Sequence, residues 1–203
     1  MIPVQEQPEP PDFSKKVRGQ GAAFIRQLSY PINWKNRKYW LKALPDLHRA
    51  YHGICAYSAH WIPCITSVDT VDHFIPKSIE PQLAYEWKNF RLCSPKFNSR
   101  KGEYQDVLDP FRLQPDWFIL DFPSHFIKPN PNLSVSQKNQ VLSTIKRLKL
   151  NDDYTCVQER LRWTLDFSEK HIDFKYLKRN TPFIAYELQR QNLLETIASI
   201  MKG

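Results

Sequence analysis

The chain has 203 residues, a formal net charge of +8 and 41% hydrophobic residues. This composition supports one ordinary domain or a small catalytic unit with helical additions, and it excludes a wholly disordered chain. No run approaches the ~18 apolar residues that a membrane span needs, and the first residues lack the pattern of a secretory signal. The sequence therefore predicts a soluble, cytoplasmic protein with no membrane partner.

Residues 1–12 hold four prolines and three acids and are expected to form a flexible arm. Residues 13–53 are predicted as a basic helical region, in which Asp12 caps a helix over 13–28 and Pro45 starts a further one. A helical stretch is also expected over 37–44, so this N-terminal region is predicted as separate helical stretches.

The helical region carries most of the positive charge. Residues 13–52 hold nine Lys or Arg and one acid, Asp46, so their excess of eight (nine minus one) equals that of the whole chain. Such clustering suits a polyanion, since neutralising phosphates releases counterions. A solvated helical face explains the same charge equally well, so the pattern alone decides nothing.

Residues 54–103 change in character. Residues 54–74 are rich in β-branched and aromatic residues and predict short strands or a hairpin. Residues 76–88 are expected to form a loop, and NFRLCS, residues 89–94, alternates well enough for one strand. Pro95 can then start a short helix. The predicted order is strand, long loop, strand, helix.

Residues 104–203 are predicted as a hairpin followed by helices. WFILDF and HFIK, within 117–128, indicate the two strands. A helix is expected over 135–150, Asn151 is expected to cap the next one, and a last amphipathic helix is expected over 181–202. We assign these helices no chemistry.

The stretch VDHFIPKS, residues 71–78, carries the strongest chemical signal. His73 can deprotonate water, because an unperturbed imidazole with a pKa of about 6.5 is largely neutral at cytoplasmic pH. Asp72 offers a carboxylate oxygen and Asn98 an amide oxygen to one divalent cation, and such ligands favour Mg²⁺ or Mn²⁺. Because adjacent strand residues point to opposite faces, a shared site requires the strand to end or bend near Pro76.

These residues resemble the HNH nuclease motif, the ββα-metal fold, in its His-Asn-Asn form. VDHF matches the Asp-His pair of that motif, and Asn89 in EWKNF matches its middle asparagine. Asn98 in FNSRKG matches the last position, and Lys101 with Gly102 matches a Lys-Gly that commonly follows. The expected fold class is therefore α+β and mostly helical, with a ββα-metal HNH core over 54–103 flanked by N-terminal and C-terminal helices.

The resemblance implies a role for each motif residue. His73 would be the general base, and Asp72 and Asn98 would hold the metal. Asn89 would tie the loop so that His73 faces the water. Lys101 is a further catalytic candidate that can contact a phosphate, although an ordinary helix-end cation explains it as well. The other histidines do not lie beside an acid and in register with asparagines, so we interpret them as structural or surface residues; they are His52, His60 and His125.

The wider stretch, roughly residues 50–165, is most similar to HNH proteins of bacterial anti-phage systems. Those include Septu-type and retron-associated nucleases that accompany an ATPase. Many relatives carry two C-x-x-C pairs that bind structural zinc, but here Ser58, Ser94 and Phe97 stand where three of those cysteines would. No structural zinc is therefore expected, and aromatic packing by Phe97 with Tyr57 and Trp61 would replace it.

The cysteines bear on the same question. The four cysteines form no C-x-x-C pair; they are Cys55, Cys64, Cys93 and Cys156. Disulfides are not expected without an export signal, and spacing alone leaves a four-cysteine zinc knot open. Buried free thiols are the preferred interpretation.

The sequence thus leads to one main hypothesis and two alternatives. The main hypothesis is a metal-dependent HNH endonuclease that hydrolyses phosphodiester bonds of nucleic acid, with double-stranded DNA favoured, in a bacterial anti-phage system with an ATPase as candidate partner. One alternative is an RNase acting on tRNA or other RNA. The other is a non-catalytic nucleic-acid-binding or scaffolding subunit.

Overall fold

The computed structural model of the protein describes residues 1–63, 70–151 and 154–202. The chain divides into two compact units, each discontinuous in sequence. Unit 1 comprises Met1–Val4, Tyr57–Trp61 and Asp106–Gly203, and unit 2 comprises Gln5–Ala56 and Ile62–Gln105. In the described ranges each unit combines helices with a two-stranded antiparallel sheet, so the predicted α+β class is confirmed. No described helix has the length and apolar character needed to cross a membrane.

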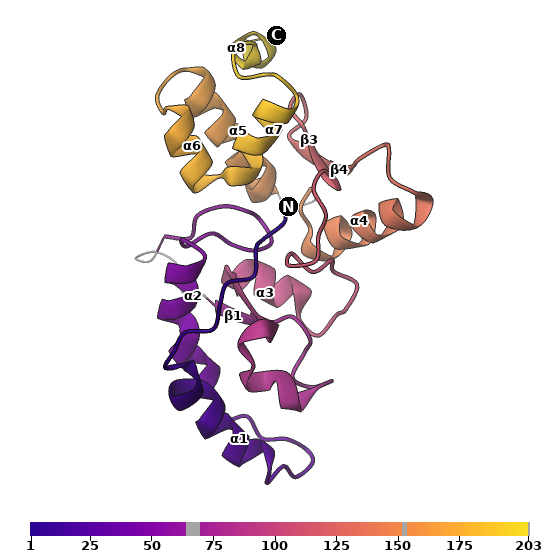
Figure 1. Ribbon diagram of the computed structural model, residues 1–203. Coiled ribbons are helices and arrows are strands. Elements are labelled where there is room, and N and C mark those ends of the chain that lie inside the picture. The colour runs from indigo at the N-terminus through magenta and orange to yellow at the C-terminus, as the bar shows by residue number, and fades with distance from the viewer. Residues whose placement is uncertain (64–69, 152–153, 203) are drawn as a thin grey trace. The chain divides into compact units, whose positions relative to one another are not determined.

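Unit 2 begins with two helical stretches, as predicted. A π-helical turn, Ser14–Arg18, continues into α1, Gly19–Ile25, and a 3₁₀ turn, Tyr39–Ala43, continues into α2, Leu44–Ala50. Phe13 and Val17 are buried along the first stretch. Gly21 permits a close approach, because a Cβ there would lie 2.1 Å from the Tyr85 ring. The helix α1 therefore packs directly on the loop that follows the first strand (Figure 1).

Residues 1–12 do not form the free arm that was expected. The Trp87 indole donates a hydrogen bond to the Gln7 carbonyl at 2.8 Å. Asp12 does not cap the first helix, and its carboxylate instead forms an ion pair with Lys16. Proline restricts the unfolded chain, so ordering this segment costs little entropy and a few contacts hold it.

The centre of unit 2 has the predicted order of elements. Strand β1, Thr70–His73, pairs antiparallel with β2, Phe90–Cys93. The loop between them contains two 3₁₀ turns, Pro81–Tyr85 and Trp87–Asn89. Helix α3, Pro95–Lys101, follows β2, ends at Gly102 with a positive φ of 51°, and packs on β1 (Figure 1).

The expected strands over 54–74 are only partly present. Strand β1 lies within this stretch, whereas residues 54–63 form turns with isolated bridges. A left-handed residue, Ala59 with φ 54°, helps to explain why no strand runs through them. The remaining part, 64–69, lies outside the described residues.

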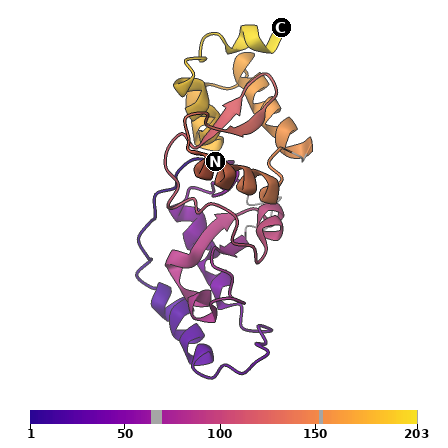
Figure 2. The same ribbon diagram turned by 90° about the vertical axis from the view of Figure 1, so that its right-hand side faces the viewer.

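Unit 1 contains the predicted hairpin and several helices. Strand β3, Phe118–Asp121, pairs with β4, Phe126–Pro129, and α4, Val135–Leu148, begins with a capping box between Ser134 and Gln137 (Figure 2). The later helices are α5, Tyr154–Ser168, α6, Phe174–Asn180, α7, Pro182–Arg190, and α8, Ile197–Lys202. The core is built from Leu148, Leu177, Ile184 and Leu188, each fully buried.

One expectation for unit 1 is wrong. The single helix predicted over 181–202 is broken, because Asn192 adopts a left-handed φ of 57° and the Leu193 amide bonds back to the Leu188 carbonyl. The predicted capping by Asn151 concerns residues 152–153, which lie outside the described residues. The Asn151 side chain also binds β4: Oδ1 accepts from the Ile127 amide at 2.8 Å and Nδ2 donates to the Ile127 carbonyl.

Candidate active site at the end of strand β1

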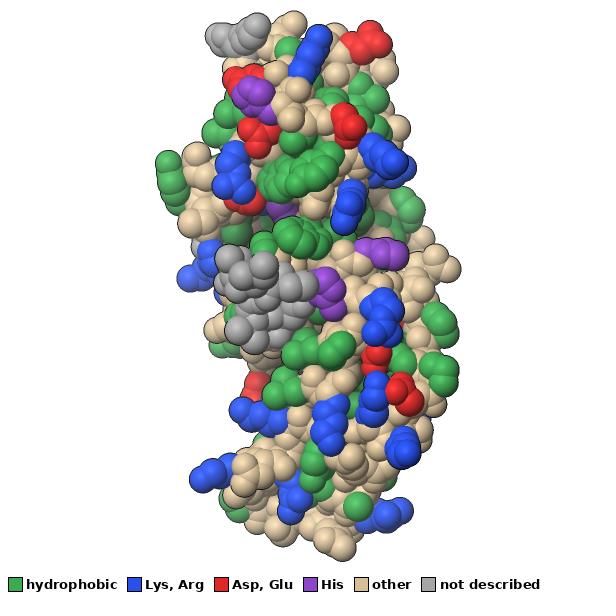
Figure 3. Space-filling model, turned by 90° about the vertical axis from the view of Figure 1, so that its left-hand side faces the viewer, with side chains coloured by type: hydrophobic (Ala, Val, Ile, Leu, Met, Phe, Trp, Pro, Cys, Tyr) green, Lys and Arg blue, Asp and Glu red, His purple; other side chains and the backbone are tan. Residues whose placement is uncertain are grey.

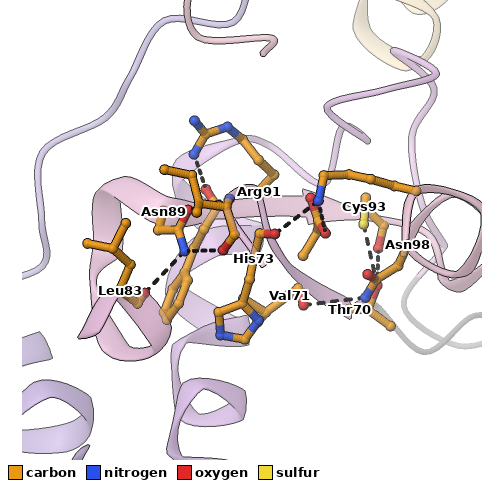
Figure 4. A network of polar contacts seen from close by, with 12 residues as sticks. Thr70, Val71, His73, Leu83, Asn89, Arg91, Cys93 and Asn98 are labelled. Atoms are coloured by element: carbon orange, nitrogen blue, oxygen red, sulfur yellow. Dashed lines mark hydrogen bonds and ion pairs between the residues drawn. The ribbon is translucent and has the colours of Figure 1, made fainter. Parts of the chain in front are cut away.

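Asn89 fixes the loop directly after β1. Its Oδ1 accepts a hydrogen bond from the Ile75 amide at 2.8 Å, and its Nδ2 donates to the carbonyls of Ile75 at 2.9 Å and Leu83 at 3.1 Å (Figure 4). The Asn89 carbonyl also accepts from the Phe74 amide. The side chain is buried, so these bonds are shielded from water. Asn89 therefore tethers the chain just beyond His73.

Helix α3 contributes two further side chains to the same segment. The Asn98 amide donates to the Val71 carbonyl at 3.3 Å, and the Lys101 ammonium donates to the His73 carbonyl at 3.0 Å (Figure 4). Together with the Asn89 bonds, these contacts hold the backbone of residues 71–75 from two directions. The end of β1 is consequently held by three side chains, those of Asn89, Asn98 and Lys101.

Lys101 forms a buried ion pair with Asp72. The Nζ–Oδ1 distance is 3.1 Å, and the residues are 0% and 2% exposed. The phosphate contact considered for Lys101 in the sequence is therefore not available in this structure. The reason is positional: α3 lies on β1, so a residue in its last turn reaches the strand instead of solvent. Removing one partner of such a pair leaves an uncompensated buried charge.

The His73 imidazole packs between aromatic rings. Its centroid lies 4.9 Å from that of Trp40 and 5.3 Å from that of Phe90, both edge to face. Nε2 lies 2.9 Å from the Ala84 carbonyl oxygen, and because a carbonyl only accepts, Nε2 must carry a proton. Ala84 could not be identified from the sequence, because a backbone acceptor has no side-chain signature.

Burial decides the protonation state of His73. It lowers the pKa of the imidazole to about 4, since a charged ring would lose its hydration, and the positive charges of Lys77 and Lys101 act in the same direction. The bond to Ala84 acts against this shift. The ring is therefore neutral near pH 7. Nδ1 then holds the lone pair, and it has no hydrogen-bond partner among the described residues.

Asp72 and His73 emerge from opposite faces of β1. The strand is regular through both residues, with Asp72 opposite Arg91 and His73 opposite Phe90 on β2. His73 is the last residue of the strand, so the chain can turn immediately after it. The structure thus brings Asp72 to α3 and the imidazole to the aromatic rings.

The oxygen donors fit a hard divalent cation. The Asn98 Oδ1 accepts no hydrogen bond within the described ranges, and its amide lies against Val71, the neighbour of Asp72. One carboxylate and one amide oxygen match the preference of Mg²⁺ and Mn²⁺. No group of three or more His, Cys, Asp or Glu that could hold a metal occurs in the described part of the chain. An ion here would share Asp72 with Lys101 and keep most of its water.

The next feature is the set of thiols and aromatic rings near the positions where many HNH relatives carry zinc-binding cysteines. Cys55 and Cys93 are buried free cysteines, and burial raises the pKa of the Cys93 thiol. Cys156 is partly exposed, and Cys64 lies outside the described residues. Phe97, in unit 2, is 6% exposed, and Trp61, in unit 1, is 42% exposed.

Two other histidines resemble His73 in burial. Nε2 of His60 and of His125 is enclosed without a hydrogen-bond partner, and burial lowers the pKa of each ring to about 4. They belong to unit 1 and have no acid, asparagine and lysine arranged as around His73 in the described ranges. Their interpretation as structural residues is therefore retained, but neither is a surface residue.

Eight of the nine basic residues of 13–52 fall into two sets; the ninth, Lys15, also forms no ion pair with a described residue. The paired set, Lys16, Arg18 and Arg49, forms ion pairs with Asp12, Asp46, Glu9 and Glu86. The unpaired set, Arg26, Lys35, Arg37, Lys38 and Lys42, forms no ion pair with any residue that the structure describes. Two of its members lie over rings instead, Arg37 over Phe24 at 5.3 Å and Lys42 over Tyr39 at 5.6 Å.

The sequence did not reveal which cations form ion pairs, because three of the neutralising acids lie outside residues 13–52. Figure 3 shows basic side chains gathered on the face that carries α1 and α2, with few acidic ones among them. Uncompensated positive charge is therefore concentrated on residues 26–42, in the unit that holds His73.

Comparisons with known proteins do not assign the chain to a family. No protein-family model matches the sequence, and no curated protein matches it either. The likeness to HNH nucleases therefore depends on the motif residues and on the arrangement described above.

Proposed function

We propose that the protein is a metal-dependent endonuclease of the HNH type that hydrolyses phosphodiester bonds of nucleic acid. The observation that carries this proposal is the state of His73: a neutral imidazole with a fixed tautomer, held at the end of a strand whose backbone is clamped by Asn89, Asn98 and Lys101. Such preorganisation is what a general base requires.

The chemistry assigned to His73 follows from its tautomer. Nε2–H is held by the Ala84 carbonyl, so Nδ1 is the atom that can accept a proton from water. The hydroxide formed attacks phosphorus, the bond from phosphorus to the 3′ oxygen breaks, and that oxygen takes a proton from solvent. Asp72 and Asn98 would hold Mg²⁺ or Mn²⁺, which supplies charge neutralisation to the phosphate when bound.

Substrate binding is assigned to the unpaired set of cations. Because these five residues are not neutralised by acids among the described residues, they can replace the counterions of a nucleic-acid backbone. Contacts of this kind position the strand but do not read its sequence. Double-stranded DNA is the substrate to test first, and a role in anti-phage defence beside an ATPase remains a prediction of the motif resemblance.

One observation favours a second candidate, a binding subunit that does not cleave. The Lys101 ammonium sits on the carboxylate that a metal would use, as expected of a polar cluster that has only a structural role. The cleavage proposal requires a divalent cation to compete with this contact. Metal binding can therefore be measured separately from activity.

The first experiment compares substrates and metals. The purified full chain is incubated with supercoiled plasmid, single-stranded DNA and total tRNA, each with Mg²⁺, Mn²⁺ or EDTA. We expect metal-dependent nicking of plasmid, and preferential loss of tRNA would favour the RNase alternative. No cleavage of any substrate with either metal would refute the endonuclease.

The second experiment measures the metal directly. Titration of Mn²⁺, followed by electron paramagnetic resonance, should show one weak site in the wild type and its loss in Asp72→Asn and Asn98→Ala. Asp106→Asn in unit 1 is the matched control and should bind like the wild type. Unchanged binding in both site variants would remove the metal from β1 and α3.

A further inference from the structure

Lys77 lies on the same tryptophan as His73. Its Nζ is 5.6 Å from the Trp40 ring centroid and 5.9 Å from that of Trp34. The Trp40 ring in turn meets the His73 ring edge to face at 4.9 Å. An ammonium from the loop after β1 and an imidazole from the last residue of β1, four residues apart in sequence, are thus positioned by a common aromatic side chain.

The two lysines near His73 are in opposite states. Lys101 is completely buried, and its ammonium is bonded to Asp72 and to the His73 carbonyl. Lys77 is half-buried and forms no ion pair with the described residues. Its charge rests on ring faces, which hold it more weakly than a carboxylate would, so moving it to an anion costs little.

The surroundings of Lys77 favour an anionic ligand. The rings beneath it belong to residues 34–40, which also contain the unpaired cations Lys35, Arg37 and Lys38. No acidic side chain is recorded against Lys77 in the described ranges. Its ammonium rests on aromatic rings and faces no acidic counterion among the described residues, which suits a phosphate.

We propose that Lys77, and not Lys101, is the cation that contacts the phosphate on which His73 acts. The ligand class is a phosphodiester anion of a nucleic-acid backbone. Trp34 and Trp40 act as positioning residues that orient the ammonium beside the imidazole. This inference rests on the proposed endonuclease function and adds a substrate-contacting residue to it.

The effect of Lys77 is expected mainly on the chemical step. Negative charge on the phosphoryl oxygens is redistributed as water attacks, and a fixed cation stabilises the transition state more than the bound substrate. Lys77→Met retains the apolar stem over the rings and removes only the charge. We expect kcat to fall by about 100-fold in this variant, with KM changed by less than about threefold.

The experiment uses the full chain on one oligonucleotide whose cleavage position has been mapped. Lys77→Met should show the loss in kcat, Lys77→Arg should recover to within about tenfold, and Lys38→Met should raise KM with little change in kcat. Melting curves should show that all three variants are folded as the wild type. If Lys77→Met is unfolded, the Arg variant and a Lys77→Gln variant provide the same comparison.

A second measurement separates contact from mere positioning. Replacing the scissile phosphate by a methylphosphonate removes one charged oxygen, and its effect should be much smaller in Lys77→Met than in the wild type. Additive losses, or a Lys77→Met enzyme with wild-type kcat, would overturn the inference while leaving the endonuclease intact. A wild-type protein that cleaves nothing would overturn both.

Discussion

The two units fix the backbone with the same device but surround it with different chemistry. In unit 2, Asn89 exchanges a pair of hydrogen bonds with the backbone of Ile75, just beyond β1, and in unit 1, Asn151 does so with Ile127 in β4. Each side-chain amide supplies the partners that these backbone groups would otherwise lack. Such a clamp is therefore a means of building a fold, and its presence alone does not indicate a catalytic site.

The neighbours of the two clamps differ. Beside Asn151, the buried Arg160 donates to the carbonyls of His125 at 2.8 Å and Leu150 at 2.9 Å, and burial lowers the pKa of its guanidinium to about 10. The guanidinium of Arg160 is thus bound to backbone carbonyls of its own unit, which is a structural role. Beside Asn89 lie a carboxylate, an ammonium and an imidazole whose Nδ1 keeps a lone pair. The second arrangement alone can take up a proton at a defined atom.

A low pKa does not by itself distinguish the two units. Burial lowers the pKa of His60, His73 and His125 alike to about 4. A backbone carbonyl fixes the tautomer of His73 through Nε2, and the Ser58 carbonyl, 2.9 Å from Nδ1, does the same for His60. What distinguishes His73 is access: Nε2 of His60 and of His125 is enclosed without a partner, whereas Nδ1 of His73 is not enclosed in this way. Access to the nitrogen that holds the lone pair, more than tautomer or protonation state, separates a candidate base from a buried histidine.

The largest predicted effect is a difference in cleavage rate between substitutions of His73 and of His125. His73→Gln should lower the cleavage rate by about 10²–10⁴-fold, because glutamine keeps a donor for the Ala84 carbonyl but cannot accept a proton. His125→Asn should leave the rate unchanged; asparagine suits the left-handed φ of 55° at this position. The measurement is single-turnover cleavage with melting curves. Equal rates in His73→Gln and the wild type would remove His73 as the base.

The two clamps should contribute similarly to stability and differently to activity. Asn89→Ala and Asn151→Ala each leave buried backbone groups of Ile75 or Ile127 without partners, so each should cost about 2–4 kcal/mol of unfolding free energy. Only Asn89→Ala should also slow cleavage, because it releases the chain next to His73. Denaturant unfolding and cleavage below the melting point test this, and an Asn89→Ala protein as active and stable as the wild type would contradict it.

The sequence predicted local elements well where the signal is local. Pro95 at the start of α3, Gly102 after it and the alternation in β2 are signals within a few residues, and the structure contains these elements. The broken C-terminal helix was missed because Asn192 gives only a weak stop signal within a periodic apolar pattern. Residues 1–12 were missed because their composition does not reveal distant anchors such as the Trp87 indole.

The candidate site was predictable in its residues but not in its partners. Asp72, His73, Asn89 and Asn98 follow from the motif. The Lys101–Asp72 pair and the Ala84 acceptor depend on distances across the fold, which spacing does not encode. The paired and unpaired cations could have been separated only by including acids such as Glu86, far away in sequence.

The pH dependence of stability provides a smaller test in unit 1. The pKa of His125 in the folded protein, about 4, lies below the unfolded value of 6.5, so between these values the unfolded chain binds more protons. The contribution of the neutral His125 ring to the free energy of unfolding is fully present above about pH 6.5 and is lost as the pH falls towards 4. Going from pH 7.5 to 5 should cost up to about 2 kcal/mol through this residue.

Replacing His125 isolates that contribution. His125→Asn should lose less stability over the same range than the wild type, whatever its stability at pH 7.5. Denaturant unfolding at a series of pH values measures the difference. Parallel pH profiles for the two proteins would show that this ring does not titrate on unfolding.

The smallest effects per residue distinguish the two kinds of surface charge. In unit 1, Arg147 is held by Asp106 and Arg190 by Glu187, whereas the unpaired set of unit 2 has no acid partner among the described residues. Neutralising Lys35, Arg37 and Lys38 together should therefore weaken nucleic-acid binding about 10- to 100-fold at moderate salt. It should also reduce the salt slope by about two to three, since each lost phosphate contact removes about 0.9.

A matched triple substitution of the paired set, Lys16→Gln, Arg18→Gln and Arg49→Gln, removes the same formal charge from the same unit. Its charges are already compensated by carboxylates, so affinity and slope should change far less. Anisotropy of a labelled duplex over a KCl series compares the two triples directly. If both shift the slope equally, net charge governs binding and the division into paired and unpaired cations has no functional meaning; if only the first does, residues 26–42 are the phosphate-binding surface beside His73.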